Sequence, residues 1–523
     1  MKRRDTLRGL GAAALVAAHW AGRIPVAMAR GEGGTFVFGT AGDPVKLDPA
    51  VVTDGQSFKT IDQVYDTLIA FDGSTTELKP ALARNWDVSA DGLTYTMKLR
   101  QGVRFHDGTA FDATAVKWNF DRWADAKNPN HVGGDFEYYT DVAGWPDVIK
   151  SVDVVDEYSV QFNLNVPQGP FLLNMALPAF VIISPASFEL DRENAYKSPV
   201  GTGPFKFIEW VPGDKVVLEK YSNYWGDVSS VDQVIIRTIP DNAARFLALK
   251  SGSIDMMDGV NTDDAVGAKK DRALSVLVRP PLNIAYLNFN QNAKPFDDVR
   301  VRQAVALGIN RAGIVEALYR GFGQVAQQMI PSHMLGFNTE IKGFAYNPDQ
   351  AKKLLAEAGY PNGFSTEFWY MPVSRPYFPN PKQFAEAFAA DLAKIGIKAE
   401  LKSEDWGTYL ADARVPKFPI WMLGWTGDNG DTDNFLFTFF GSEGSGNTWK
   451  NVDARKLLAK AQASADSSER DGIYQQVNAL IEKEIPRLPI AHTNVPLVAR
   501  SYVKGYLAHP TGSEHYNLVW LDK

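Results

Sequence analysis

Apolar and polar residues alternate in short runs through the first part of the chain. Residues 93–99 and 159–164 alternate with the period of two that a half-buried strand requires. Residues 35–38 form a short apolar run that ends at a glycine, as expected for a buried strand. Between these strands, residues 113–123 have the apolar spacing of a helix. The pattern therefore predicts a β-rich region before about residue 280.

From about residue 281 the pattern changes to helices that alternate with strands. Asn347 is followed by Pro348, an N-cap with a proline at the first helical position, and Gly359 ends the same helix. The predicted elements are helices at 349–358 and 383–395 and strands at 364–369, 397–401 and 419–423. This alternation predicts a mostly parallel sheet, whose ligands gather beyond the strand ends.

Length and composition limit the class of protein. A chain of 523 residues is longer than a domain built on a single hydrophobic core, so two or three lobes are expected. With 45% hydrophobic and 22% charged residues, the composition is that of an ordinary soluble globular protein. Together with the change of pattern, it predicts an α/β protein of more than one lobe.

The N-terminus has the pattern of an export signal. Basic residues precede an apolar run at residues 10–21, which is shorter than the roughly 20 apolar residues that cross a bilayer. Ala27 and Ala29 then give a small-x-small cleavage pattern, so residues 1–29 are predicted to be a signal peptide cleaved near Ala29. Arg3 and Arg4 leave the route open between Sec and twin-arginine export. The predicted location is the periplasm.

Charge and cysteine content exclude several partners. Cleavage after residue 29 removes five basic groups and one acidic group, which changes the net charge from −7 to −11. A chain this acidic is a poor candidate for nucleic acid or anionic membranes. The absence of cysteine excludes disulfides, thiolate metal sites and a lipid-modified N-terminal cysteine. No later stretch approaches 18 uninterrupted apolar residues, so the chain is not predicted to be membrane-embedded.

Motifs for cofactor chemistry are missing. The sequence has neither a phosphate-binding P-loop nor a Gly-x-Ser-x-Gly elbow, and residues 201–206 lack the third glycine of a dinucleotide fingerprint. The seven histidines are scattered without paired ligand spacing, so zinc is not expected. We therefore predict no cofactor, no metal and no nucleophilic enzyme chemistry.

The segment Gly424–Phe435 places three aspartates and three glycines next to Trp425, directly after a predicted strand. An EF-type calcium loop fails on spacing from both Asp428 and Asp431. A hydrolase using two of the aspartates stays open. A third interpretation is a pocket for an organic ammonium, because a carboxylate beside an aromatic face binds such a cation. The remaining alternative is that the aspartates form turns and Trp425 packs in the core.

A second loop carries a single arginine between prolines and aromatic residues, at residues 369–381. Arg375 in a rigid loop after a strand suits bidentate binding of a carboxylate. The alternative is that Arg375 stacks on Tyr377 as surface packing.

Three segments and two loops together resemble a known family. The segments are 91–108, 199–206 and 295–304, and the loops are 371–377 and 424–435. They resemble the periplasmic solute-binding proteins of peptide/nickel-type ABC transporters (family 5), and the loops are most similar to those of its dipeptide-binding members. The resemblance implies a monomeric binding protein, not an enzyme, that delivers a small peptide to an inner-membrane permease with its ATPase subunits.

The resemblance also assigns residues. Asp428 would hold the α-ammonium of the peptide and Arg375 its α-carboxylate. The remaining ligand-binding residues would be Gly424, Trp425, Thr426 and Tyr377. We expect Asp431 and Asp433 to support the turn, and Thr40–Pro44 to be a candidate segment of the pocket on the first lobe. Thr432 and Ser374 stand where the resemblance leads us to expect proline and a longer polar residue, which bears on ligand preference.

The implied fold is the type II periplasmic-binding-protein fold of the peptide-binding cluster, with an extra β-rich domain inserted in the first lobe. Lobe I would consist of residues 30–62, 195–281 and 491–523, the extra domain of 63–194, and lobe II of 282–490. Because the fold is widely reused, an oligopeptide, δ-aminolevulinate, haem or another small solute stays open as the ligand. A periplasmic hydrolase stays open as a remote alternative.

Overall fold

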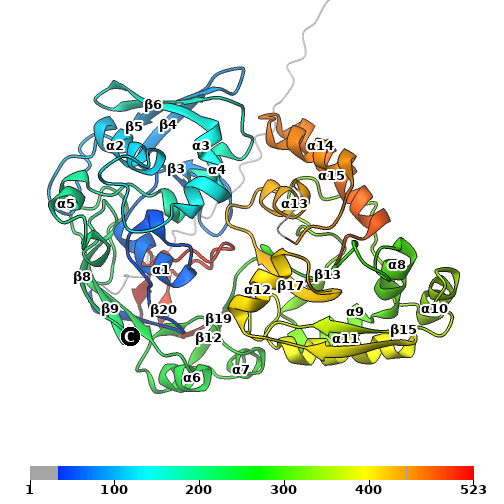
Figure 1. Cartoon of the computed structure of the whole chain (residues 1–523). Helices are drawn as coiled ribbons and strands as arrows, with labels where there is room; N and C mark the ends of the chain where they lie inside the picture. Colours follow the sequence, from blue (N-terminus) through cyan, green and yellow to red (C-terminus); the bar gives the residue numbers. More distant parts are fainter. Residues whose placement is uncertain (1–32, 443–445) are drawn as a thin grey trace, which may run out of the picture.

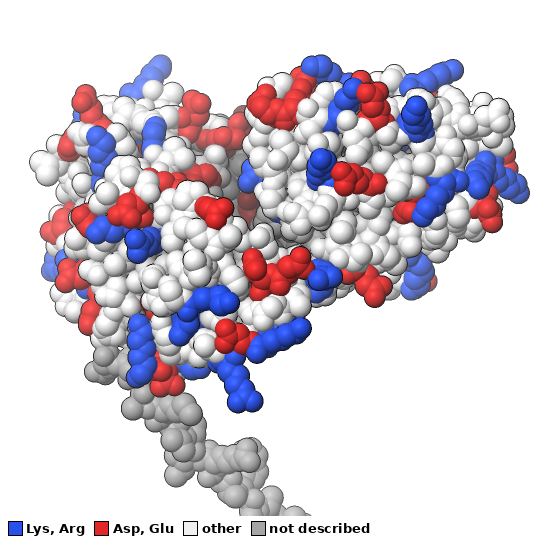
Figure 2. Space-filling model, turned by 90° about the horizontal axis from the view of Figure 1, so that it is seen from below, with Lys and Arg blue, Asp and Glu red and all other residues white. Residues whose placement is uncertain are grey.

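The computed structural model describes residues 33–442 and 446–523. The predicted signal peptide and its cleavage site near Ala29 lie outside the described residues. The described chain forms two bodies, and their surfaces meet along a hollow (Figure 2). Segments from both ends of the chain lie in the same body, where the blue α1 (Gly55–Val64) is close to the red C-terminal segment (Figure 1).

A seven-stranded mixed sheet forms the base of the first body, in the order β12-β19-β11-β1-β10-β9-β8. Its strands are β1 (Thr35–Thr40), β8 (Phe205–Val211), β9 (Lys215–Lys220), β10 (Gln233–Thr238), β11 (Met256–Met257), β12 (Leu274–Val278) and β19 (Pro496–Arg500). Helices α6 (Asn242–Ser251) and α7 (Thr262–Ala268) lie beside it (Figure 1). The strand predicted at residues 35–38 is confirmed as the start of β1.

The β-rich region predicted in the first part of the chain forms an antiparallel sheet in the order β4-β5-β7-β6. Its strands are β4 (Ala83–Val88), β5 (Thr94–Leu99), β6 (Ile149–Asp156) and β7 (Ser159–Leu164), and the helices around it are α2 (Ala113–Ala124), α3 (Trp145–Val148), α4 (Phe171–Asn174) and α5 (Pro185–Leu190). The pair β2 (Ile69–Phe71) and β3 (Leu78–Pro80) lies next to it. This sheet shares one apolar core with the seven-stranded sheet, so the two form a single body.

A six-stranded sheet supports the second body, in the order β14-β18-β13-β17-β15-β16. Its strands are β13 (Asn283–Phe289), β14 (Gly323–Val325), β15 (Phe364–Trp369), β16 (Ile397–Lys402), β17 (Ile420–Thr426) and β18 (Arg487–Thr493). Its helices are α8 (Val299–Gly308), α9 (Arg311–Tyr319), α10 (Pro348–Glu357), α11 (Pro381–Lys394), α12 (Trp406–Arg414), α13 (Asp433–Phe440), α14 (Val452–Gln462) and α15 (Ser467–Glu484). The predicted strands and helices at residues 349–423 are confirmed.

The prediction of a mostly parallel sheet is wrong. Only β15 pairs in parallel, with β16 and with β17, whereas β13, β14 and β18 pair antiparallel. The pattern at residues 347–423 covers the strand–helix–strand units, whose crossover helices make neighbouring strands parallel. β13 and β18 instead adjoin the segments that cross between the bodies. The alternation of apolar and polar residues does not indicate whether such strands run parallel or antiparallel to their neighbours.

Side chains of β13 show how this sheet is covered on both faces. Ala285, Leu287 and Phe289 belong to the core under α8–α12, whereas Ile284 and Tyr286 belong to the core under α13–α15. The alternation follows because successive side chains of a strand point to opposite faces. Figure 1 shows α13, α14 and α15 on one side of the sheet and α9 and α11 on the other.

Two short segments connect the bodies, at residues 279–282 and 494–495. They lie side by side, since the backbone N–H of Arg279 donates to the carbonyl oxygen of Val495 at 2.9 Å. A second two-stranded sheet, of β20 (Val503–Lys504) and β21 (Trp520–Leu521), ends the chain in the first body. The hollow of Figure 2 thus lies between two bodies that meet through a narrow double connection.

Candidate functional site

Both loops singled out in the sequence leave the second-body sheet at the same end. β15 and β17 pair in parallel, with Phe368 opposite Ile420 and Trp369 opposite Trp421. Because the carboxyl ends of parallel strands lie at one end of a sheet, the segments after them, 370–380 and 427–432, emerge next to each other. This is the crevice position that the sequence predicted for a ligand.

Gly424, Trp425 and Thr426 are the last residues of β17, not part of the loop that follows. Gly424 provides the space that Tyr377 occupies, since a Cβ on Gly424 would lie 2.1 Å from a ring carbon of Tyr377. The Tyr319 hydroxyl donates to the carbonyl oxygen of Tyr377 at 2.6 Å and fixes that residue. Thr426 pairs with Asn283 of β13. The structure therefore brings Gly424 and Tyr377 into direct contact.

Asn434, in α13, connects Trp425 to Asp428. Its amide Nδ2 donates to Asp428 Oδ2 at 2.9 Å. Its Oδ1 accepts from the backbone N–H of Asp428 at 2.9 Å and from Trp425 Nε1 at 3.1 Å. Asn434 thus sets the orientation of both predicted ligand groups. It lies in the acidic segment itself, but nothing in the local pattern distinguished it from a turn residue.

Asp428 also contacts the first body. The hydroxyl of Tyr138, the first residue of a short π-helical turn at Tyr138–Val142, donates to Asp428 Oδ1 at 3.3 Å. The ring of Tyr138 packs edge-on against Phe58 of α1, with 5.7 Å between ring centroids. π-Helical turns are often found at functional sites. The sequence offered no signal for Tyr138, which lies 290 positions before Asp428.

None of the described residues neutralises the charge of Asp428. Its carboxylate is half-buried, and burial raises its pKa, while the hydrogen bonds from Asn434 and Tyr138 act in the opposite direction. Both donors are neutral, and no ion pair with Asp428 is found among residues 33–442 and 446–523. A half-buried carboxylate held by neutral donors favours a ligand that brings its own positive charge.

The other two aspartates of the segment have structural roles. Asp431 forms a bidentate ion pair with Arg470 of α15, at 2.6 and 2.9 Å, in which both side chains are buried. Asp431 Oδ1 also accepts from the backbone N–H of Asp433 at 2.8 Å, so it supports the turn into α13. Asp433 itself is buried and accepts from Gln462 at 3.1 Å. Asp428 is left as the aspartate that can receive a cationic ligand.

The pKa of Asp433 gives a prediction for stability. Burial and the charge of Asp431 raise it above the ordinary value of 3.8. The folded state therefore holds a proton that the unfolded carboxyl loses, and stability falls as the pH rises from the ordinary pKa through the neutral range. We expect Asp433→Asn to unfold at a higher temperature than the wild type at pH 8 and at nearly the same temperature at pH 4. Calorimetric scans at both pH values measure this; a variant with the same pH dependence as the wild type would contradict it.

Arg375 lies on the surface of its loop. Its guanidinium stacks over the ring of Trp406, 4.9 Å from the ring centroid, and it forms no ion pair within the described part of the chain. The alternative interpretation from the sequence placed it on Tyr377, which is instead buried against Gly424. Arg375 is thus a cation held by an aromatic face, and no carboxylate of residues 33–442 or 446–523 pairs with it.

A small cavity of about 70 Å³ lies at Asp428, between the two bodies. The first body contributes the N-terminal half of α1, Tyr138, residues 177–178 and part of the C-terminal segment. The lining residues are Gly55, Phe58, Tyr138, Leu177, Pro178, Asp428, Thr511, Gly512 and Ser513. Thr40–Pro44 is not part of this lining. The cavity is smaller than the about 300–1,000 Å³ that ligand sites usually measure.

Within the described residues, no three His, Asp or Glu side chains converge as a metal site requires. Of the helices in the same residues, none has both the length and the apolar character needed to cross a membrane.

Comparison with known proteins is consistent with this arrangement. Residues 77–447 match the bacterial extracellular solute-binding proteins, family 5 (middle region). The dipeptide-binding protein of Escherichia coli K12 is 36% identical over 93% of this chain and 95% of its own length. Haem-binding protein A of Haemophilus influenzae is 36% identical over 93% of this chain and 92% of its own length.

A solved structure extends the similarity to three dimensions. An ABC transporter-associated periplasmic binding protein from Helicobacter pylori, in complex with the peptide STSA, superposes with a TM-score of 0.81 at 35% identity. The match covers 94% of this chain and 99% of that one. The α/β architecture is thus the type II periplasmic-binding-protein fold, and the chain belongs to family 5 of the bacterial extracellular solute-binding proteins.

Proposed function

We propose that this protein is the periplasmic substrate-binding component of an ABC importer and that it binds dipeptides between its two bodies. The observation that carries the proposal is Asp428, a half-buried carboxylate at the junction of the bodies that has only neutral hydrogen-bond donors. The α-ammonium of a peptide supplies the missing positive charge. Trp425, which shares Asn434 with Asp428, and Thr426 would flank the ammonium from the end of β17, although neither lines the small cavity at Asp428.

Arg375 is the proposed partner of the peptide carboxylate. It carries a planar guanidinium suited to bidentate binding and has no acidic partner of its own among the described residues. An extended chain spans at most about 3.3–3.6 Å per residue, so an acid and a base fixed on one closed site select peptides by length. A longer peptide would leave one terminal charge without a partner.

The domain division expected from the sequence is part of the same proposal. Lobe I consists of residues 30–62, 195–281 and 491–523, the extra domain of 63–194 and lobe II of 282–490. The grouping of most strands into a seven-stranded, a four-stranded and a six-stranded sheet supports this division, although β18 crosses the boundary at residue 490. Closure about the segments at 279–282 and 494–495 encloses the ligand. The monomer, cleaved near Ala29 and without catalytic activity, then delivers the peptide to a permease with its ATPase subunits.

The carboxylate end of the site is tested with Arg375→Gln. We expect wild-type protein to bind Ala-Ala about tenfold more tightly than its C-terminal amide, and the variant to bind both equally, because the exposed guanidinium acts on the free carboxylate. Isothermal titration calorimetry measures both ligands. Arg414→Gln, an exposed arginine on α12, is the matched control and should keep the wild-type preference. A preference that survives in Arg375→Gln would refute the assignment.

A longer peptide is the second candidate ligand. It is favoured by the Helicobacter pylori relative, whose structure holds a four-residue peptide. The haem-binding relative shows that one family accommodates different solutes. Native mass spectrometry of protein purified without refolding separates these ligands by the mass that the protein carries.

A further inference from the structure

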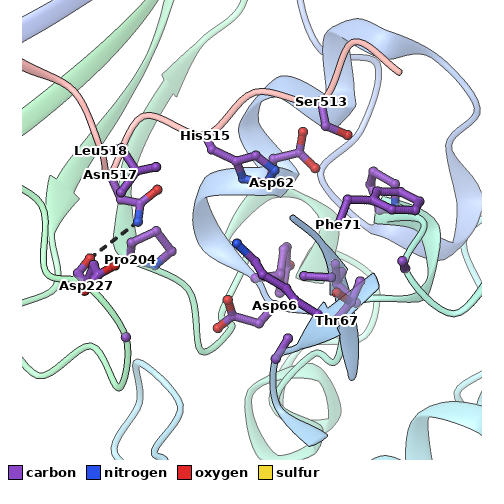
Figure 3. A pocket seen from close by; sticks show the side chains of 18 of the residues that line it. Asp62, Asp66, Thr67, Phe71, Pro204, Asp227, Ser513, His515, Asn517 and Leu518 are labelled. Carbon is purple, nitrogen blue, oxygen red and sulfur yellow. Dashed lines mark hydrogen bonds between the residues drawn. The ribbon is translucent and has the colours of Figure 1, made fainter. Parts of the chain in front are cut away.

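A second cavity, of about 300 Å³, lies in the first body behind the C-terminal half of α1. Helix α1, the segment 224–227 and the C-terminal segment 513–518 contribute to its walls (Figure 3). It is lined by aromatic rings, among them Phe71 and Trp225, together with several carboxyl and amide groups. Its volume falls within the range of small-molecule sites.

This cavity and the Asp428 cavity lie along one face of α1. Gly55 and Phe58 line the Asp428 cavity, and Asp62 and Tyr65 line the larger one. The spacings of three, four and three residues place all four positions on the same face. The two cavities also share Pro178 and Ser513. They are therefore neighbours, separated by one helical turn of α1.

Two polar side chains in the larger cavity have atoms that make no hydrogen bond within the described residues. Asp62 accepts the backbone N–H of Glu514 at 2.9 Å through one oxygen, and its other oxygen has no hydrogen bond within the described residues. The ring of His515 likewise makes no hydrogen bond there. Asp62 and His515 lie next to each other, with Ser513 beside them (Figure 3).

The charged groups around Asp62 are already paired. Arg279 forms an ion pair with Glu514 at 2.5 Å, and Lys59 forms one with Asp258 at 3.0 Å. On the far wall, Asp66 accepts only neutral donors, from Tyr224, Trp225 and Thr202. At the rim, Lys79 is exposed and lies 3.5 Å from Asp72. Asp227, which also lines the cavity, forms no ion pair within the described residues either, so the cavity holds three such carboxyl groups: Asp62, Asp66 and Asp227.

We infer that this cavity binds the side-chain ammonium of a peptide whose first residue is lysine, with Asp62 and His515 as its hydrogen-bond acceptors. The inference rests on the proposed function, because the α-ammonium of the same peptide is held at Asp428. Phe58 and Asp62 are four residues apart, about 6 Å along the helix. A lysine side chain extends about 6 Å from its α-carbon to its ammonium. The methylene groups pass Phe58 and the wall formed by Pro178.

Binding of such a side chain has a proton signature. Burial raises the pKa of Asp62 to about 8, so the empty cavity holds a protonated carboxyl at pH 6.5. Burial lowers the pKa of His515 to about 4, so its ring is neutral. An arriving ammonium favours the carboxylate, and Asp62 releases its proton to the buffer. Lys59 and Arg279, which also face this region, stay in their ion pairs with Asp258 and Glu514.

The test compares Lys-Ala with norleucine-Ala, which has the same chain length without the ammonium, and with Ala-Ala. Titration calorimetry of wild-type protein at pH 6.5 should give at least about tenfold tighter binding of Lys-Ala than of norleucine-Ala. Repeating the titration in buffers of different ionisation enthalpy should show release of close to one proton for Lys-Ala and none for norleucine-Ala. Asp62→Asn should lose both the preference and the proton release.

Asp72→Asn is the matched control, because Asp72 is an exposed carboxylate close to the same cavity and does not line it. It should keep the wild-type preference. Equal affinities of Lys-Ala and norleucine-Ala would overturn the inference and leave the proposed function in place, as would a preference that persists in Asp62→Asn. Failure of all three peptides, including Ala-Ala, to bind would overturn the proposed function and this inference with it.

Discussion

Asp428→Asn is expected to weaken dipeptide binding by a factor between about 30 and several thousand. This factor corresponds to about 2–5 kcal/mol, the usual cost of removing one member of a hydrogen-bonded charge pair in a binding site. Asparagine keeps the size of the side chain and its hydrogen bond with Asn434, so the change removes the charge and little else. Titration calorimetry with Ala-Ala measures the loss.

An aspartate-to-asparagine substitution at Asp433, in the same segment Gly424–Phe435, provides the control. Asp433→Asn changes a buried carboxyl at the start of α13 that accepts from Gln462 and does not line the Asp428 cavity. Its dissociation constant should stay within about twofold of the wild type, although its stability changes with pH as described above. If the two variants bind Ala-Ala equally well, Asp428 is not the ammonium anchor.

Arg470→Met is expected to cost about 3–5 kcal/mol of unfolding free energy. The side chains of Arg470 and Asp431 are only 7% and 4% exposed, and removal of one partner leaves the other charge buried without compensation. Arg470 also donates to the hydroxyl of Tyr474 at 2.9 Å and to the carbonyl oxygen of Ala461 at 3.1 Å, so two further acceptors lose their donor. Urea unfolding followed by tryptophan fluorescence measures the loss.

Lys460→Met separates this effect from the loss of any ion pair. Lys460, on the neighbouring helix α14, pairs with Glu469 at 2.8 Å, but the two side chains are 62% and 39% exposed. Such a pair contributes at most about 1 kcal/mol. The double variant Asp431→Asn with Arg470→Met should lose less than Arg470→Met alone, because the uncompensated carboxylate is gone. Similar losses in Arg470→Met and Lys460→Met would show that the buried pair does not hold the loop.

The three aspartates of the segment Gly424–Phe435 show which site features the local sequence can predict. Trp425 and the glycines indicated an ammonium site in the segment Gly424–Phe435, and the resemblance pointed to Asp428. The physical reason for that choice lies elsewhere in the chain. Arg470, 39 positions after Asp431, neutralises that carboxylate, and Asn434 orients Asp428. A cation contributed by a distant helix leaves no signal in the segment that it neutralises.

The residues that the first body contributes to the Asp428 cavity could not be predicted from the local sequence either. Tyr138 and Ser513 come from segments far from Asp428 in the sequence, and neither follows a motif. The segment suggested from the sequence, Thr40–Pro44, is part of the first body and does not line the cavity. Pocket walls assembled from several segments depend on how the segments pack, which hydrophobic periodicity does not encode.

The sequence by itself determined the strands and helices whose apolar periods are regular, the change of pattern near residue 281 and the two loops that follow β15 and β17. These features are local, since each depends on residues within one element and its caps. The tertiary structure decided the antiparallel direction of β13 and β18, the burial of Asp431 with Arg470, and the meeting of Tyr138 with Asp428. Those features depend on contacts between residues tens to hundreds of positions apart, and only the packed chain brings such residues together.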